Sequence, residues 1–442
     1  MTGPARDDAP RTVVLRGGRV VDPRTGRDEV TDVRIEDGRI ASVGTERGDA
    51  DAHVIECGGA LVVPGLVDLH AHLREPGFEH KETIETGTRA AALGGYTAVA
   101  AMANTQPVAD HAAIVHEIRD LAVAAGLCEV FPVGAITKGL AGESLAEMGE
   151  MVDAGVRVFS DDGNAVPTAR LLRNALTYAK AFPVEVVIAD HAEDPSLVEG
   201  GQMHEGLASA SLGLTGRPAE AEEIAVARDL AVTRMTGGRL HLCHLSSARA
   251  VDLVRRAKSD GVRVTAEVTP HHLVFTDDDL RTYDTNLKMN PPVRSAEDRD
   301  ALRAGLADGT IDAVATDHAP HAVEEKEAEF DRSPPGTIGL ETALAVVLTE
   351  LVGPGVLDLL TAVERLSATP ARILGATDHG GPIEPGRPAH LAVIDPGAAW
   401  TVEPPFASRG RNSAFLGRRL RGRVVHTFLS GRPTVSDGKA TA

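Results

Sequence analysis

Cysteine is scarce in this sequence, and long apolar runs are absent. The three cysteines, Cys57, Cys128 and Cys243, are widely spaced, and no CxxC pair occurs. An odd number of scattered cysteines is no disulfide framework, and the missing CxxC pair argues against a thiolate zinc site. No apolar run approaches the ~20 residues that span a bilayer, and residues 1–11 hold no apolar stretch of the signal-peptide kind. These absences predict a soluble, cytoplasmic protein.

Positive charge is also in short supply. The 442 residues contain 45 Lys and Arg against 64 Asp and Glu, so the formal net charge is -19. This balance argues against a nucleic-acid interface, which requires a basic patch, and against adhesion to an anionic membrane surface. Solubility explains most of the excess. An anionic substrate would therefore need cations placed locally inside its site.

Both ends of the chain have the character of β structure. Short runs rich in Val and Ile alternate with turn residues before residue 62, and Asp37-Gly38 between two such runs is a strong hairpin signal. Similar runs return at 389–394 and 423–429. We predict that residues 1–62 and 381–442 form one small β-sandwich domain.

The middle of the chain alternates between apolar runs and Ala-rich segments of helical period. Near-continuous apolar strands separated by helices are typical of a parallel sheet, and eight repeats indicate a closed barrel. The predicted fold class is α/β, with a (β/α)8 TIM-like barrel over residues 63–380. The apolar runs are 61–70, 96–102, 129–136, 156–160, 184–191, 240–245, 262–268 and 311–316, with helical segments such as 82–93, 111–125, 219–236 and 248–258 between them.

The first of these runs ends in His70-Ala71-His72. Side chains at positions i and i+2 of a strand point to the same side. The two imidazoles therefore converge at the carboxyl end of the strand, where barrel active sites lie. Taken alone, the pair leaves open both a metal site and two chemically idle histidines.

Four further runs also end in polar residues, and together they favour the metal site. A buried barrel strand has no packing use for a polar end, and Asp is depleted in strands. Histidine and aspartate are ligands that suit zinc. The four endings are Asp161-Asp162, Asp190-His191, His241 with His244, and Asp317-His318.

Three segments of the sequence resemble a known family. Residues 64–77, which contain His70, His72 and Arg74, resemble the signature of the dihydroorotases of bacterial class I type, in the amidohydrolase superfamily. Residues 288–292 and 316–321 resemble two further blocks of that family. The resemblance extends from about residue 12 to residue 432. The long first block is specific to the family, whereas the HxH pattern alone would indicate only the superfamily.

The resemblance implies a binuclear zinc site, with two Zn²⁺ ions per subunit. Many relatives bridge the two metals with a carboxylated lysine after the fourth strand, but this chain has Asp161-Asp162 there. Asp162 matches the bridging residue, and Asp161 stays open as the alternative. The implied metal ligands are His70, His72 and Asp317 for one ion, His191 and His244 for the other, and Asp162 for both.

The resemblance also implies a site for a ring that carries a carboxylate. A planar guanidinium binds a carboxylate through two hydrogen bonds, and Arg74 occupies a position where hydantoinase-like relatives usually lack an arginine. Loop capping stays the alternative role for Asn104 and Asn290, and Pro335 replaces the aromatic residue usual in the family. The implied substrate-binding residues are His72, Arg74, Asn104, Asn290, His321, Pro335 and Gly336.

Other polar residues are assigned structural roles. We predict surface or helical positions for His53, His111, His116 and His390, and a solvated loop at 324–327. His271-His272 follows the seventh apolar run at a place that faces the site, but the resemblance assigns it no role.

The implied activity is that of a dihydroorotase. This enzyme reversibly cyclises N-carbamoyl-L-aspartate to (S)-dihydroorotate and water, the third step of de novo pyrimidine biosynthesis. A hydroxide shared by the two metals would attack in the hydrolytic direction, with Asp317 as general acid and base.

Two other functions are possible alternatives to that of a dihydroorotase. A hydantoinase or allantoinase is the nearer alternative, and Arg74 and the missing lysine count against it. The other is a non-catalytic homologue that scaffolds aspartate carbamoyltransferase, but such chains lose metal ligands and this one retains all six. We expect a small-molecule substrate, no nucleic acid or membrane, a homo-oligomer, and a possible complex with aspartate carbamoyltransferase.

Overall fold

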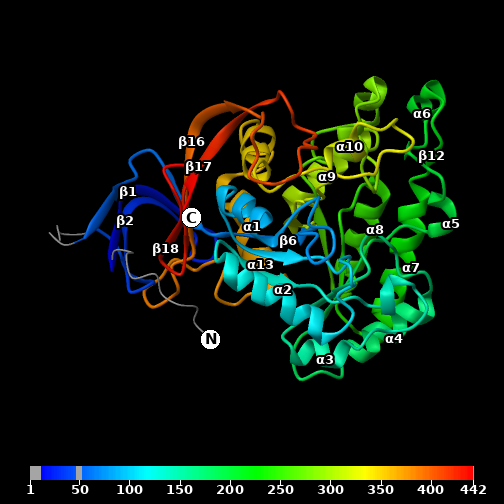
Figure 1. Ribbon diagram of the computed structural model, residues 1–442, viewed down its shortest axis with the longest axis horizontal. Coiled ribbons are helices and arrows are strands. Elements are labelled where there is room, and N and C mark those ends of the chain that lie inside the picture. The colour runs from blue at the N-terminus through cyan, green and yellow to red at the C-terminus, as the bar shows by residue number, and fades with distance from the viewer. Residues whose placement is uncertain (1–10, 46–51, 442) are drawn as a thin grey trace.

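The computed structural model describes residues 11–45 and 52–441, and the polar segment at 1–10 lies outside them. Figure 1 shows two bodies side by side. Strands from both chain ends, coloured blue and red, form a sheet on the left, and alternating strands and helices form a barrel on the right. No helix of the described residues is long and apolar enough to cross a membrane.

The two chain ends meet in one nine-stranded sheet, joined through β5 (Leu61–Pro64). This strand pairs in parallel with β1 and antiparallel with β16. The predicted hairpin is confirmed, with Asp37 and Gly38 both at positive φ, 46° and 81°, as a tight hairpin turn requires. The remaining strands are β1 (Thr12–Asp22), β2 (Arg27–Glu36), β3 (Arg39–Val43), β4 (His53–Glu56), β16 (Leu391–Thr401), β17 (Arg419–Leu429), β18 (Arg432–Ser436) and β19 (Lys439–Ala440).

The barrel is closed, as the sequence predicts. Hydrogen-bonded pairing joins its strands in two groups, and parallel bridges between Gly134 and Phe159 and between Ala71 and His318 close the gaps. The main-chain N–H of His72 donates to the His318 carbonyl at 2.8 Å across one of these gaps. The barrel strands are β6 (Leu66–Ala71), β7 (Tyr96–Ala101), β8 (Glu129–Pro132), β9 (Val158–Ser160), β10 (Val187–Asp190), β13 (Leu240–Leu242), β14 (Val264–Val268) and β15 (Ala313–Val314).

The predicted first barrel strand, 61–70, is wrong in one respect. The chain divides it at Gly65: residues 61–64 belong to the small sheet as β5, and only β6 enters the barrel. A Cβ at Gly65 would lie 2.3 Å from Cγ2 of Thr97, so the turn passes too close to β7 for any side chain. The domain boundaries at 62/63 and 380/381 stay predictions.

Helices cover the outside of the barrel, and several of them begin at polar caps. The Ser247 side chain, for example, accepts from the Ala250 N–H at the start of α8. The helices on the barrel are α1 (Ile84–Leu93), α2 (Ala112–Ala125), α3 (Met148–Asp153), α4 (Ala169–Ala179), α7 (Glu220–Thr236), α8 (Ala248–Ser259), α9 (Ala296–Asp308), α11 (Ala343–Val347), α12 (Leu359–Val363) and α13 (Thr369–Leu374). Shorter elements in the connections are α5 (Pro195–Val198), β11 (Met203–His204), α6 (Leu207–Leu212), β12 (Gly216–Arg217) and α10 (Val323–Lys326).

Two structural predictions made outside the site are corrected. His390 is buried rather than at the surface: its ring stacks on that of His379 with centroids 4.0 Å apart, and its Nδ1 accepts from the Ser430 N–H. The segment 324–327 is not a solvated loop, because it contributes to α10 and the Lys326 ammonium is buried. Lys326 Nζ donates to the Pro334 and Gly336 carbonyls at 2.9 and 3.2 Å, which explains its burial.

Candidate metal centre

The six predicted ligands lie together at one rim of the barrel. His70 is the penultimate residue of its strand, each of the others follows a strand by at most three residues, and parallel strands bring their carboxyl ends to the same rim. All six side chains are buried: His70, His72, Asp162, His191, His244 and Asp317.

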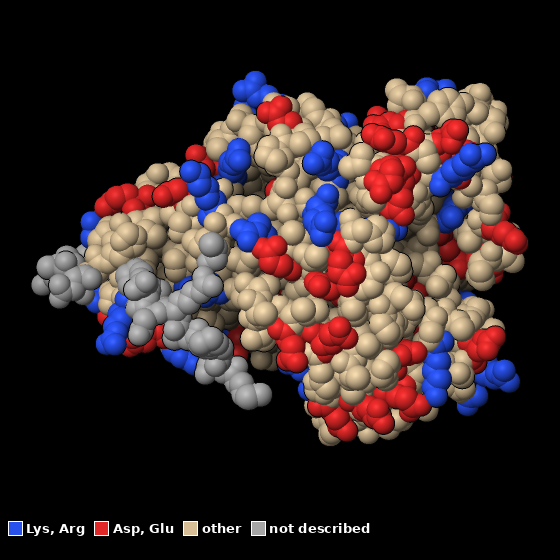
Figure 2. All heavy atoms as spheres, in the orientation of Figure 1, with Lys and Arg blue, Asp and Glu red and all other residues tan. Residues whose placement is uncertain are grey.

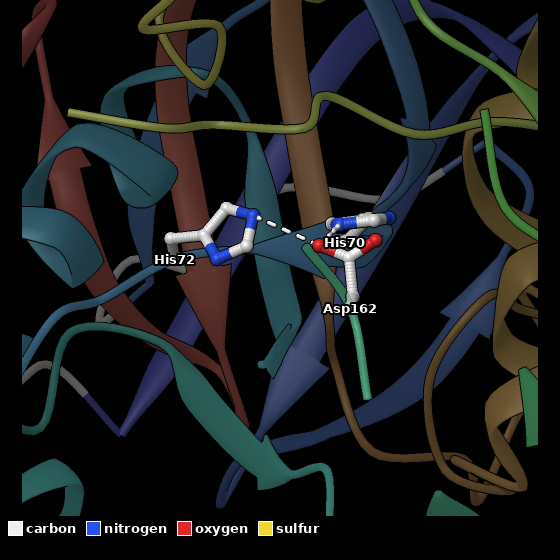
Figure 3. A group of neighbouring side chains, drawn as sticks. All are labelled: His70, His72 and Asp162. Atoms are coloured by element: carbon white, nitrogen blue, oxygen red, sulfur yellow. Dashed lines mark ion pairs between the residues drawn. The ribbon is translucent and has the colours of Figure 1, made fainter. Parts of the chain in front are cut away.

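Asp162 is at the middle of this group. Its Oδ2 lies 3.1 Å from Nε2 of His70 and 3.5 Å from Nε2 of His72. Figure 3 shows this side of the cluster, with both histidines from the end of β6 and the aspartate from the segment after β9. The other oxygen, Oδ1, lies 3.1 Å from Nε2 of His244 and 3.5 Å from Nδ1 of His191. One carboxylate thus faces two pairs of histidines, each through a different oxygen.

Asp161, the alternative to Asp162, points elsewhere. Its Oδ1 accepts from the main-chain N–H groups of Ile136 and Thr137 at 2.8 and 2.9 Å, and its Oδ2 accepts from the Thr137 hydroxyl. These contacts engage both oxygens with the segment after β8. Of the two aspartates, only Asp162 faces the histidines.

Asp317 lies on the His70 and His72 side of the cluster. Its Oδ1 is 3.2 Å from Nε2 of His72 and 3.6 Å from Nε2 of His70. Burial alone would raise the pKa of the Asp317 carboxyl, but the neighbouring imidazoles of His72, His70 and His244 hold that pKa below its usual range. The side chain is therefore an ionised carboxylate at neutral pH, able to bind a cation or accept a proton.

Hydrogen bonds fix three of the four histidine rings from behind. Nδ1 of His70 bonds Glu267 at 2.8 Å, Nδ1 of His72 bonds Asn104 at 2.9 Å, and Nε2 of His191 bonds Glu193 at 3.0 Å. An N–H donated outward to an oxygen leaves the other ring nitrogen as a lone pair, the form that binds a metal.

The donor atoms form two overlapping sets that fit two divalent cations. His70, His72 and Asp162 bring their ligand atoms within 4.8 Å of one another, and so do Asp162, His191 and His244. Nδ1 of His191 and Nε2 of His244 lie only 3.0 Å apart. Such convergence of imidazole nitrogens on a shared carboxylate is the nitrogen and oxygen environment that zinc prefers.

Three residues of the site hold unusual backbone conformations. Arg74, His244 and Asp317 have φ values of 64°, 30° and 44°, in the left-handed region that residues other than glycine seldom adopt. Strain of this kind persists only where the surrounding structure enforces it, and it concentrates at functional sites.

The predicted substrate-binding residues border the cluster. Arg74 Nε donates to the Pro320 carbonyl at 3.3 Å, and the outer guanidinium nitrogens have no hydrogen bond to the described residues. Burial lowers the pKa of Arg74 to about 10, and the Asp317 charge opposes that shift, so the side chain stays a cation beside the cluster. Asn104 accepts from His72 rather than capping a loop, and its amide nitrogen remains available for a ligand.

The other predicted contacts belong to two hydrogen-bonded groups. His321 Nε2 bonds the Pro335 carbonyl at 3.0 Å, and Gly336 N–H donates to the Lys288 carbonyl at 2.8 Å, so these three predicted residues share one loop cluster. Asn290 Oδ1 accepts from Arg217, which also pairs with Glu193 at 3.2 Å. Asn290 is thus linked through two side chains to His191.

The residues that support the predicted ligands by hydrogen bonds were not predicted from the sequence. Glu267 accepts from both His70 and His241, and its ligand atoms also group with those of Cys243 and His70. A glutamate inside the apolar run 262–268 was the signal that could have identified it. Glu193 and Arg217 carried no comparable signal. His271 is buried near the cluster, and its Nε2 has no hydrogen-bond partner in the described part of the chain.

Comparison with known proteins gives a consistent result. A family model described as Dihydro-orotase-like matches residues 59–250. A dihydroorotase of Pelotomaculum thermopropionicum is 52% identical over 426 residues, covering 96% of this chain and 99% of the relative. A dihydroorotase of Streptomyces coelicolor is 51% identical over 431 residues, covering 97% and 99%.

Solved structures share the fold at lower identity. An L-hydantoinase from Arthrobacter aurescens superposes with a TM-score of 0.87 at 27% identity, with 97% of each chain covered. A dihydropyrimidinase from Brevibacillus agri superposes with a TM-score of 0.84 at 24% identity, covering 97% of this chain and 96% of that one.

Proposed function

This chain belongs to the dihydroorotase family, and from that premise we propose that it catalyses the reversible cyclisation of N-carbamoyl-L-aspartate to (S)-dihydroorotate and water. The observation that carries the proposal is the half-buried Arg74 guanidinium, with its outer nitrogens unengaged by the described residues, beside the carboxylate and imidazole cluster. A cyclic amide without a carboxylate would leave this partly buried cation without an anionic partner, whereas the carboxylate of the substrate can pair with it.

We assign the metal ligands as the sequence predicts, with two Zn²⁺ ions held by His70, His72, Asp162, His191, His244 and Asp317. The shared position of Asp162, facing two histidine pairs, supports this assignment. Two divalent ions, when bound, supply a water molecule activated at neutral pH and polarise the carbonyl group of the ring.

The chain's own residues provide orientation and proton transfer. Arg74 and Asn104 hold the substrate carboxylate, so the reacting carbonyl is presented in one orientation. In hydrolysis, the Asp317 carboxylate takes a proton from the attacking water and gives it to the ring nitrogen that leaves. In cyclisation, Asp317 begins protonated and the same transfers run in reverse. Asn290, His321, Pro335 and Gly336 contact the ring.

We further propose that the protein acts in the cytoplasm as a homo-oligomer and can associate with aspartate carbamoyltransferase. The composition and the family resemblance support these three points, and size-exclusion chromatography with and without the transferase tests the last two.

The function is tested by assaying the purified protein in parallel with elemental analysis. We expect turnover of N-carbamoyl-L-aspartate and dihydroorotate, much slower turnover of hydantoin and allantoin, and close to two metal ions per chain. Preferred turnover of hydantoin or allantoin would assign the site to another cyclic-amide hydrolase, and protein with full metal but no turnover of any of them would refute a catalytic role.

A further inference from the structure

A cavity of about 910 Å³ lies at the opposite end of the barrel from the candidate metal centre. This volume is within the range of small-molecule sites, about 300–1,000 Å³. Five arginines and two glutamates line the cavity, together with apolar residues of α13. The arginines are Arg24, Arg157, Arg239, Arg372 and Arg387.

The barrel itself places two of these arginines. Arg157 directly precedes β9 and Arg239 directly precedes β13, so both lie at the amino ends of their strands. Their carbonyls accept from the N–H groups of Val187 and Ile188 at 2.9 and 3.0 Å, so β10 lies between them. Equivalent positions on neighbouring parallel strands thus bring the two side chains to the same rim.

Most of the positive charge in the cavity is not neutralised. Arg239 pairs with Glu185 at 2.9 Å, but Glu185 also pairs with Arg263 at 2.7 Å. Within residues 11–45 and 52–441, neither Arg24, Arg157 nor Arg372 has an ion-pair partner. Arg24 and Arg157 instead donate to main-chain carbonyls, and Arg372 donates to the Thr369 hydroxyl.

Arg387 adds a further unsatisfied group. Its nearest carboxylate oxygen, from Asp378, is 3.9 Å away, and its Nε is buried without a hydrogen-bond partner among the described residues. Burial lowers the pKa of Arg239, the Glu185 carboxylate opposes that shift, and the nearby charges of Arg263 and Arg372 add to it.

This cluster contrasts with the rest of the molecule. The chain has a net charge of -19, and Figure 2 shows acidic side chains in several groups over the barrel with basic ones scattered between them. Guanidinium groups bind phosphate oxygens through paired hydrogen bonds. The arginines outnumber the glutamates by three, which suits a ligand with several negative charges.

We propose that this cavity binds a small anion that carries a chain of phosphates, of the nucleoside diphosphate or triphosphate class, through Arg24, Arg157 and Arg372. The apolar side chains of Ile373 and Leu374 line the same cavity and can contact the uncharged part of such a ligand. The site is separate from the proposed reaction and does not depend on it.

Calorimetric titration of the intact protein at low ionic strength tests the proposal, with inorganic triphosphate and ATP as probes. We expect at least one of them to bind with a Kd below about 1 mM. Tighter binding of ATP would indicate a nucleotide ligand, and equal binding would indicate that the phosphate chain alone is recognised. No binding of either probe would overturn the proposal.

One double variant and a charge-matched control distinguish binding in this cavity from chelation of metal at the other rim. The Arg24→Gln, Arg372→Gln double variant should weaken binding by about tenfold or more. The control double variant, Arg255→Gln with Arg281→Gln, changes the net charge equally and should bind like wild type. Equal affinity in both double variants would place the ligand elsewhere and refute the site.

A conservative variant tests the geometry of the contact. Arg157→Lys keeps the charge but removes the planar fork, so we expect affinity between those of wild type and the Arg24→Gln, Arg372→Gln variant. Wild-type affinity in this variant would show that Arg157 makes no directed contact and would remove it from the proposed site.

Discussion

At the scale of the single residue, Asp317 has both a close imidazole neighbour and an unusual backbone conformation. Its carboxylate lies 3.2 Å from Nε2 of His72, and its backbone is held at a φ of 44°. We predict that Asp317→Asn retains most of the bound metal and lowers kcat by roughly 10²–10⁴, the usual contribution of a positioned acid or base. Elemental analysis and steady-state kinetics check both parts. A variant with full metal and near wild-type kcat would contradict the proton-transfer role.

Arg74 is the residue that we expect to define substrate choice. Removal of one charge-assisted partner of a buried group costs about 2 kcal/mol, or ~30-fold in equilibrium constant. Arg74→Gln should therefore lower kcat/KM for N-carbamoyl-L-aspartate by at least that factor. Its effect on a ring without a carboxylate should be small.

A matched control for Arg74 is Arg89→Gln, which removes a half-buried arginine of α1 that pairs with Glu85. Parallel kinetics on dihydroorotate and hydantoin compare the variants. Equal losses on both rings in the Arg74 variant would speak against recognition of the carboxylate.

Glu341 links the barrel to the segment at 407–408 and makes stability depend on pH. Its Oε1 accepts from the N–H groups of Ala407 and Ser408 at 3.0 and 3.3 Å. Burial raises the pKa of Glu341 to about 7 from a usual value of 4.5, and the Glu82 charge adds to this effect. The native protein therefore keeps a proton that the unfolded chain releases. The resulting stabilisation is complete below pH 4.5 and is lost as pH rises through 7.

Glu341→Gln removes this titration but retains an oxygen that can accept both hydrogen bonds. We expect the stability of this variant relative to wild type to increase between pH 5 and pH 8. Urea denaturation at both pH values measures the difference. A difference that does not vary with pH would show that Glu341 does not titrate in this range.

At the scale of secondary-structure elements, α7 determines the position of the loop after β13. The buried Glu222 carboxylate on α7 accepts from the N–H groups of Ser246 and Ser247 at 3.0 and 2.9 Å, and from both serine hydroxyls. These serines follow His244 and precede α8. One acidic side chain thus connects a helix, a helix cap and a predicted metal ligand.

Glu222→Gln replaces one accepting oxygen by an amide group that can only donate. We expect a loss of ~2–4 kcal/mol in unfolding free energy and weaker metal binding at the His191 and His244 side. Glu223→Gln is the control, because the Glu223 side chain makes no hydrogen bond or ion pair with the described residues. Denaturation and metal titration compare the two variants. Equal losses of unfolding free energy in the two variants would show that the contacts of Glu222 with the serines do not cause the loss.

At the scale of the whole molecule, we expect metal binding to stabilise the fold. The cluster buries two carboxylates and four imidazoles whose donor atoms converge, and metal binding to the native state alone adds ~4 kcal/mol when free metal exceeds its Kd a thousandfold. Chelation should therefore abolish activity and lower the thermal midpoint, and two equivalents of zinc should restore both. Full activity after complete removal of metal would contradict the proposed mechanism.

Much of the fold could be read from the sequence because it depends on local pattern. Eight apolar runs with helical segments between them predict the barrel, and Asp37-Gly38 predicts its hairpin through backbone conformation alone. The division at Gly65 could not be predicted, since 61–64 runs directly into 66–71 and both segments begin with apolar residues typical of strands. Their separation results from pairing of β5 with β16, which comes more than 300 residues later.

The same difference between local sequence pattern and long-range packing applies to the candidate site. The sequence by itself determined which histidines and aspartates end the strands, because strand order and the parallel barrel bring those ends to one rim. Only the tertiary structure decided that Asp162 faces the histidines while Asp161 bonds the segment after β8. It also decided that Glu267 supports His70 and that unpaired arginines meet at the opposite rim. The physical reason is that side-chain direction and long-range contact depend on packing between distant segments, which no local pattern of residues encodes.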